Sequence, residues 1–428
     1  MITLSRFFKA VLIIVSMYML EYLDIVLPSG NTDMFRVIIG GIAVTLALMT
    51  LVIPKKSPDF KKKIRFANRF FIIYIPIVLL TSVVSVIWYG YKLMSTLAIV
   101  MPYFFPLYAY PLIYIFYKDK TYKKFLKKIV ILVVVIMCIK AITWYLYNYH
   151  GIILFEKLLF KHSQKWVRNG MLRMDISYLF GVSLCFLLCE FFVEHKRKAI
   201  IPAVGMILFT VFITQYRFLE IVIIITVLLV YLTSADSNRR ELIRILLLAA
   251  AGILFIALGG LDAILASFSF ENVDYGSSNK ARLLTVEYFW SLMKGIQPVI
   301  GLGFLYSYSP RATALLTRSK NLSYWMEDIG ILGGFFTFGM LSLLIYGSLF
   351  FRSIKICVTF VRNKYADRAF LTSIVGYMIV CCLMLNILDR QRLFDTGFYI
   401  AIISYIAAKD ETHLRSPIAT RKLKAPKK

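Results

Sequence analysis

Residues 70–88 read FFIIYIPIVLLTSVVSVIW, an uncharged and strongly apolar run of 19 residues. As an α-helix this run is about 28 Å long, close to the roughly 30 Å hydrocarbon core of a bilayer. A backbone in lipid must satisfy its own hydrogen bonds, so such a run predicts a helix. Apolar blocks of about 17 to 25 residues recur along the chain, whereas the alternating ten-residue segments of a transmembrane barrel are missing from the sequence.

These blocks predict an all-α polytopic membrane protein of about twelve transmembrane helices, organised as a single integral membrane domain over residues 1–428. The blocks 199–215 and 218–233 together are too long for one crossing, which favours two helices. The expected spans lie near 7–27, 34–53, 70–88, 93–117, 126–147, 176–193, 199–215, 218–233, 245–261, 323–351, 369–387 and 394–408.

Composition agrees with this class: 60% of residues are hydrophobic and 17% are charged, whereas soluble chains carry roughly a quarter charged residues. The net charge of +27 comes from Lys and Arg clusters between the spans. Clusters in these places indicate orientation and contact with anionic membrane lipids rather than with nucleic acid. The six cysteines and four histidines show no metal-ligand spacing, so we expect neither a metal nor a cofactor.

The positive-inside rule orients the chain. KKSPDFKKKIRFANR at 55–69 and KDKTYKKF at 118–125 lie in short loops that become cytoplasmic when both termini are cytoplasmic. The basic segment 409–428 then forms a cytoplasmic tail. Two long loops, 148–175 and 262–322, become extracytoplasmic, and their basic residues require another explanation because long loops translocate largely regardless of charge.

Three stretches on the outer side carry candidate chemistry. Arg217 follows TQY at 214–216, where it binds an anion or simply pairs with Glu220 three residues on. In the large outer loop we expect a short helix over about 280–294, begun by Ser277, Ser278 or Asn279. Arg282 in its first turn is unfavourable for the helix dipole unless an anion binds there.

After that helix, Gly301 and Gly303 allow a tight turn or a close approach by a ligand. Glu327 and Asp328 stand at the mouth of the span 323–351 and are either candidate general bases or residues that favour a helix start. Arg390 and Arg392 fall in a short outer loop, which should avoid Arg, and therefore indicate anion contact or an ion-pair cluster.

In order along the chain, these segments resemble the bacterial O-antigen polymerase and ligase superfamily, the Wzy-type proteins. The resemblance is carried by TQYR at 214–217, RLLTVEYFWSLMKGIQPVIGLGF at 282–304 and EDIGILGG at 327–334. It covers residues 176–350, while residues 1–175 match only in hydropathy. The family's ligases place a His shortly before the glycine stretch; Asn321, Ser323, Glu327 and Asp328 occupy that region here, which argues against a ligase.

The resemblance implies a metal-independent membrane glycosyltransferase that polymerises undecaprenyl-pyrophosphate-linked oligosaccharide repeat units. Arg217 and Arg282 would hold the pyrophosphate and Glu327 or Asp328 would be the base. It also implies a capsule, O-antigen or exopolysaccharide pathway in the cell (inner) membrane, with a flippase and a chain-length regulator as further partners. The alternatives are a flippase or transporter of lipid-linked oligosaccharides, another lipid-dependent glycosyltransferase using Glu21 and Asp24, and a structural membrane subunit.

Overall fold

The computed structural model describes residues 3–26, 32–52, 57–160, 167–168, 170–235, 243–244, 276–319 and 322–413. It is 79% helical with almost no sheet, as the apolar blocks predict. The expected span 245–261, the start of the large outer loop and the tail beyond residue 413 lie outside the described residues.

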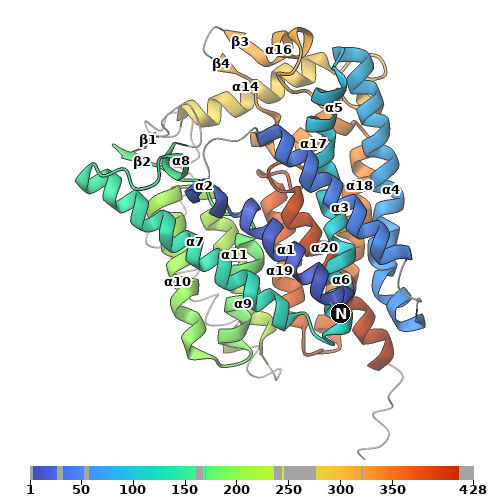
Figure 1. Cartoon of the computed structure of the whole chain (residues 1–428), viewed down its shortest axis with the longest axis vertical. Helices are drawn as coiled ribbons and strands as arrows, with labels where there is room; N and C mark the ends of the chain where they lie inside the picture. The colour runs from blue at the N-terminus through green and yellow to red at the C-terminus, as the bar shows by residue number, and fades with distance from the viewer. Residues whose placement is uncertain are drawn as a thin grey trace, which may run out of the picture.

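The first half of the chain forms a helical bundle with one small hairpin (Figure 1). Its elements are α1 (Leu4–Met19), α2 (Tyr22–Val26), α3 (Thr32–Val52), α4 (Pro58–Tyr89), α5 (Leu93–Val100), η1 (Met101–Tyr108), α6 (Ala109–Lys118), α7 (Lys123–His150), α8 (Glu156–Leu159), β1 (Val167–Arg168), β2 (Met171–Leu172), α9 (Phe180–Phe192), η2 (Arg197–Ala199), α10 (Ile200–Leu208), η3 (Phe209–Thr214) and α11 (Arg217–Thr233).

In the second half, α14, α15, α16 and a second hairpin lie over one end of the bundle, and α18 to α20 return into it (Figure 1). The elements are α14 (Gly276–Leu292), α15 (Gln297–Ile300), α16 (Pro310–Leu316), β3 (Thr317–Ser319), β4 (Leu322–Ser323), η4 (Met326–Ile329), α17 (Ile331–Phe338), α18 (Leu341–Arg362), α19 (Arg368–Cys382) and α20 (Leu393–His413).

Six helical segments within the described residues are long and apolar enough to cross a bilayer, so the chain is a membrane protein. They are Asp33–Val52, Pro58–Tyr89, Leu93–Lys118, Lys123–His150, Arg197–Thr214 and Leu341–Arg362. Shorter apolar helices cover Phe180–Phe192, Arg368–Cys382 and Leu393–Ala408. The helix that contains the 70–88 run, α4, begins with the Ser57 side chain accepting from the Phe60 amide and ends at left-handed Gly90.

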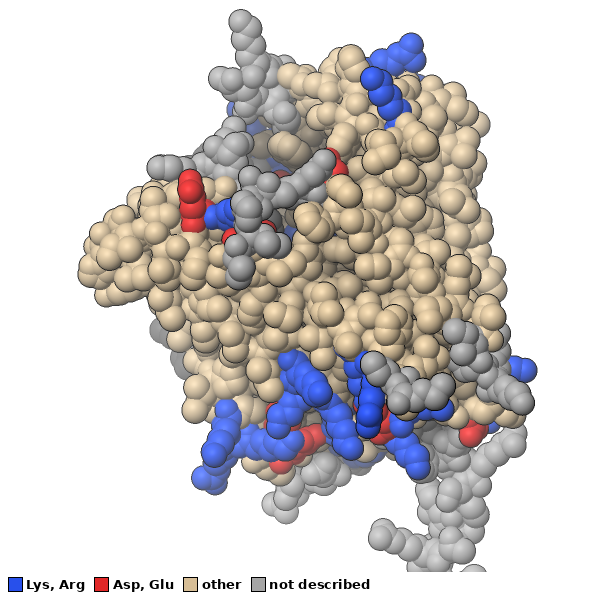
Figure 2. Space-filling model, viewed as in Figure 1, with Lys and Arg blue, Asp and Glu red and all other residues tan. Residues whose placement is uncertain are grey.

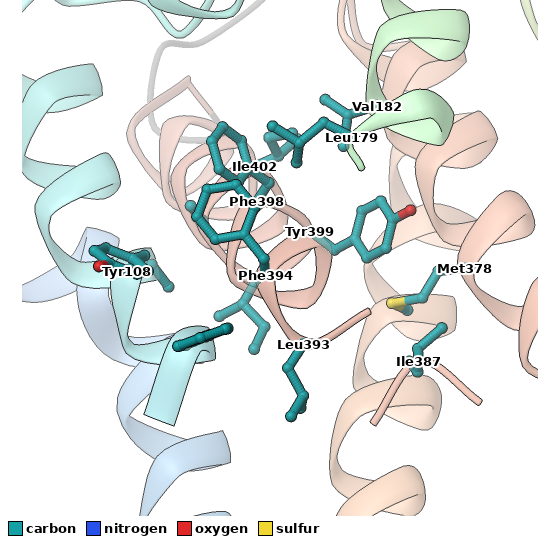
Figure 3. Packing of buried hydrophobic residues seen from close by; sticks show 14 of the residues in the cluster. Tyr108, Leu179, Val182, Met378, Ile387, Leu393, Phe394, Phe398, Tyr399 and Ile402 are labelled. Carbon is teal, nitrogen blue, oxygen red and sulfur yellow. The ribbon is translucent and has the colours of Figure 1, made fainter. Parts of the chain in front are cut away.

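The segment Leu93–Lys118 forms the centre of the bundle, since 89% of its most apolar stretch of 18 residues is buried. Its Tyr108 hydroxyl donates to the Ile39 carbonyl of α3, and its ring meets Phe394 of α20 edge-on. Figure 3 shows Tyr108 beside Phe394 and Phe398, with Tyr399 pointing toward Met378 of α19. The core therefore joins the first helices of the chain to the last.

The expected single span 323–351 is not one helix. The chain forms the short helices η4 and α17 and then restarts as α18, with Gly330 (φ +57°) and Gly339 (φ +61°) at the two breaks. Left-handed backbone cannot continue a right-handed helix, and glycine adopts it without a steric penalty. The block 199–215 and 218–233 does form two segments, separated by Gln215 at φ +51°.

Candidate functional site

On the face shown in Figure 2, charged side chains gather mainly in two places, and a few basic side chains stand apart at the upper right. One is a band of Lys and Arg at the end where the N-terminus and the end of α20 lie. The other surrounds a hollow near the opposite end, and a wide uncharged surface separates the two. The candidate site is built at that opposite end from three segments: the loop 301–308, η4, and the loop 383–392 between α19 and α20.

The loop 301–308 runs along α17 by backbone contact. The Leu302 amide donates to the Phe336 carbonyl (2.6 Å), and the Gly303 amide donates to the Thr337 carbonyl (3.1 Å). Gly301 has φ +80°, and a β-carbon there would stand 2.2 Å from the Thr337 oxygen. The sequence predicted that these glycines allow either a tight turn or a close approach by a ligand. At Gly301 the structure places the backbone of α17, not an open ligand space, against the glycine.

The end of α4 fixes the same loop through side-chain hydrogen bonds. The Tyr91 hydroxyl donates to the Tyr306 carbonyl (2.9 Å) and accepts from the Tyr306 amide (3.0 Å). The Ser85 hydroxyl accepts from the Phe304 amide (2.7 Å), and the Tyr89 hydroxyl donates to the Leu302 carbonyl. This network holds the Tyr306 ring in place.

Arg390 lies over that ring. Its guanidinium carbon is 4.6 Å from the Tyr306 ring centroid, a cation–π arrangement. The Nε and Nη1 atoms of Arg390 are buried and have no hydrogen-bond partner among the described residues. Buried charged donors left unpaired are costly, which indicates a site prepared for an anion.

Glu327 lies next to this arginine. It is half-buried, and its Oε2 accepts from the Gln391 side-chain amide at 2.8 Å. Burial, followed by the neighbouring Asp389, raises the pKa of Glu327 to about 8, although Arg390 and Arg392 oppose the shift. Asp389 itself is buried, and burial raises its pKa as well. Asp328, the other predicted carboxylate, is exposed.

Arg282 and Arg392 both lie near Tyr216. Both arginines and Asp328 lie close enough to the Tyr216 hydroxyl to interact with it electrostatically. Burial raises the pKa of Tyr216, and the two arginines oppose that shift. The Tyr216 hydroxyl, the Arg282 Nε and the Arg392 Nη1 are buried and lack a hydrogen-bond partner in the described part of the chain.

Two cavities border the loop 386–392. The first, about 570 Å³ with its open mouth, is lined by Tyr103, Tyr306, Tyr324, Trp325, Glu327 and Asp389 among others. The second, about 960 Å³ with its mouth, includes Arg36, Asp175, Ser177, Arg392, Asp395 and Tyr399 in its lining. Glu327 therefore faces one cavity and Arg392 faces the other.

The structure thus brings together Arg282, Arg390 and Arg392 with Glu327 and Asp328. Arg217, by contrast, interacts with Glu220 on its own helix, and it is the preceding residue, Tyr216, that faces the arginines. Two basic residues of the predicted loop 148–175 bind the backbone of this turn: Arg168 donates to the Gln215 carbonyl (2.7 Å) and Arg173 to the Thr214 carbonyl (2.8 Å).

Sequence reasoning did not single out Tyr216, Tyr306 or Trp325 as site residues. Tyr216 precedes Arg217 and Trp325 lies two residues before Glu327, so proximity to a predicted charge was the available signal for these two. Tyr306, within YSYSP at 306–310, has no such signal in the sequence. Glu21, considered as an alternative catalytic acid, forms a 2.7 Å ion pair with Lys140.

A comparison with protein-family models finds no match for this chain, and a comparison with curated proteins finds none either.

Proposed function

We propose that this protein polymerises undecaprenyl-pyrophosphate-linked oligosaccharide repeat units into a capsular, O-antigen or exopolysaccharide chain at the outer face of the cell membrane. The observation that carries the proposal is the set of buried guanidinium atoms on Arg282, Arg390 and Arg392 that have no hydrogen-bond partner among the described residues. Two of these arginines, Arg390 and Arg392, interact electrostatically with the half-buried carboxyl of Glu327. Cationic donors without partners suit a pyrophosphate, and a carboxylate beside them suits a hydroxyl nucleophile.

In the proposed reaction, a sugar hydroxyl of the acceptor attacks the anomeric carbon of the donor glycan. The new glycosidic bond forms as the bond from that carbon to the pyrophosphate oxygen breaks, and the lipid pyrophosphate leaves with the bonding electron pair. The arginines stabilise the charge on the leaving group. Glu327 takes the hydroxyl proton, a role for which a pKa near the working pH is favourable.

The proposed orientation places the basic band and both termini in the cytoplasm and the site outside. The band in Figure 2 supports this, because short cytoplasmic loops carry an excess of Lys and Arg. Charges at the start of α7 and after α9 pair locally, Lys123 with Glu194 and Lys196 with Glu190, each at 2.6 Å. A flippase that supplies the repeat units and a chain-length regulator are the proposed partners.

The test is the length of surface polysaccharide in cells that carry single substitutions. Arg282→Ala, Arg390→Ala, Arg392→Ala and Glu327→Gln should each abolish long polymer and leave lipid-linked repeat units at the outer face. Arg311→Ala is the matched control, since Arg311 is an exposed arginine of the same outer loop. Long polymer from all four site variants would refute the proposal, and repeat units trapped at the inner face would indicate a flippase instead.

A further inference from the structure

The cavity beside Glu327 has an aromatic and acidic lining. Tyr103, Tyr306, Tyr324 and Trp325 contribute rings, and Glu327 and Asp389 contribute carboxyl groups. None of the described residues that line this cavity is a lysine or an arginine. The cavity on the other side of the loop is lined by Arg36 and Arg392 together with Asp175 and Asp395. Of the two, only the second therefore offers cationic donors to an anion within its described lining.

One ring in this cavity remains open. Tyr306 is covered by Arg390 at 4.6 Å, Tyr324 stacks on Tyr288 at 4.0 Å, and Tyr103 packs on Phe304 at 4.1 Å. Trp325 is 57% exposed, and within the described residues its indole makes no ring contact. An exposed indole two residues from Glu327 offers an apolar face to a ligand that the carboxyl also reaches.

We infer that this cavity binds the terminal sugar of the acceptor glycan, that this sugar is uncharged, and that Trp325 is the surface on which its ring stacks. The C–H face of a pyranose suits the indole, and its hydroxyl groups suit the carboxyl groups as hydrogen-bond acceptors. An acidic sugar would find no lysine or arginine in the described lining to pair with its carboxylate, and it would be repelled by Glu327 wherever that residue is ionised. The inference rests on the proposed function, since the attacking hydroxyl must reach Glu327.

Saturation-transfer NMR on the full chain in detergent tests this, with galactose, N-acetylglucosamine and glucuronate as probes. We expect transfer to at least one of the two neutral sugars and none to glucuronate. Trp325→Ala should weaken neutral-sugar binding by about tenfold, the equivalent of about 1.4 kcal/mol. Trp325→Phe should retain most of the binding, because it keeps an aromatic face.

The matched control is Trp290→Ala. Trp290 is 59% exposed and stacks on Phe335, and it is not among the residues that line the cavity. This variant should bind the sugar as the parent protein does. The inference is overturned if neither neutral sugar binds or if glucuronate binds equally well. It is also overturned if Trp325→Ala and Trp290→Ala bind the sugar alike. Sugar binding as expected, together with long polymer from all four site variants named under the proposed function, would instead refute the proposed function.

Discussion

Lys140 lies in the middle of α7, where its ammonium group pairs with the Glu21 carboxylate at 2.7 Å. The two side chains are only 2% and 10% exposed. Lys140 also donates to the Asp175 carbonyl (3.3 Å), and Glu21 stands at the break between α1 and α2 with φ +67°. The pair therefore joins a broken first helix, a later helix and the segment that precedes α9.

Replacing Lys140 with methionine should lower the free energy of unfolding by about 3–5 kcal/mol, because the buried Glu21 carboxylate loses its cationic partner. The double variant Lys140→Met/Glu21→Met should recover most of that loss, since two apolar side chains of similar volume need no desolvation. The interaction energy between the two substitutions should therefore be a large fraction of the loss in unfolding free energy caused by Lys140→Met alone.

Denaturant unfolding of the purified protein in detergent, followed by tryptophan fluorescence, measures these differences. Lys9→Met is the control: Lys9 pairs with Asp119 at 2.6 Å, but its side chain is 28% exposed. This substitution should cost no more than about 1 kcal/mol. A Lys140→Met effect as small as that of Lys9→Met, or a double variant as unstable as the sum of the singles, would refute the reasoning.

Three further predictions concern the site. Since burial raises the pKa of Glu327 to about 8, its carboxyl is mostly protonated below that pH, so polymer formation by membranes should rise between about pH 6.5 and 8.5; a flat profile in the parent protein would exclude Glu327 as the base. Gly301→Ala should destabilise the protein strongly in thermal unfolding, whereas Gly41→Ala, with nothing within 4 Å of its added β-carbon, should not. Tyr91→Phe should cost about 1–3 kcal/mol in the same measurement and shorten the polymer, because the Tyr306 backbone loses its partner; unchanged polymer would show that this network does not position the site.

Hydropathy predicted those helical segments whose formation depends only on an apolar composition. The run 70–88 lies inside α4, and its burial needs no particular neighbour because lipid accepts any apolar surface. Hydropathy failed at 323–351, because an apolar run that contains glycines has the same hydropathy whether it forms one helix or several. The break depends on distant partners, such as the Pro298 carbonyl that accepts from the Met340 amide. No local pattern reveals such a partner.

The candidate charged residues also rest on local rules, and the structure shows where each of them lies. Arg390 and Arg392 were chosen because a short outer loop should avoid arginine, and both lie at the site beside Glu327. The choice of Arg217 identified the right turn but not the residue that faces the arginines. The left-handed conformation of Gln215 sets which of the next two side chains faces them, and a sequence does not specify that angle. The role of Arg217 in binding pyrophosphate stays a prediction.

The broken helix and the glycine loop require each other. Ending α17 at Gly339 leaves its last carbonyl groups without partners in the helix, and two of these, on Phe336 and Thr337, accept from the amides of Leu302 and Gly303. The approach is so close that a β-carbon on Gly339 would stand 2.4 Å from the Gly301 nitrogen. The loop that satisfies the break also carries the Tyr306 ring to Arg390. The glycines therefore act on the site indirectly: they allow the backbone contact that sets where Tyr306, and with it the arginine, lies.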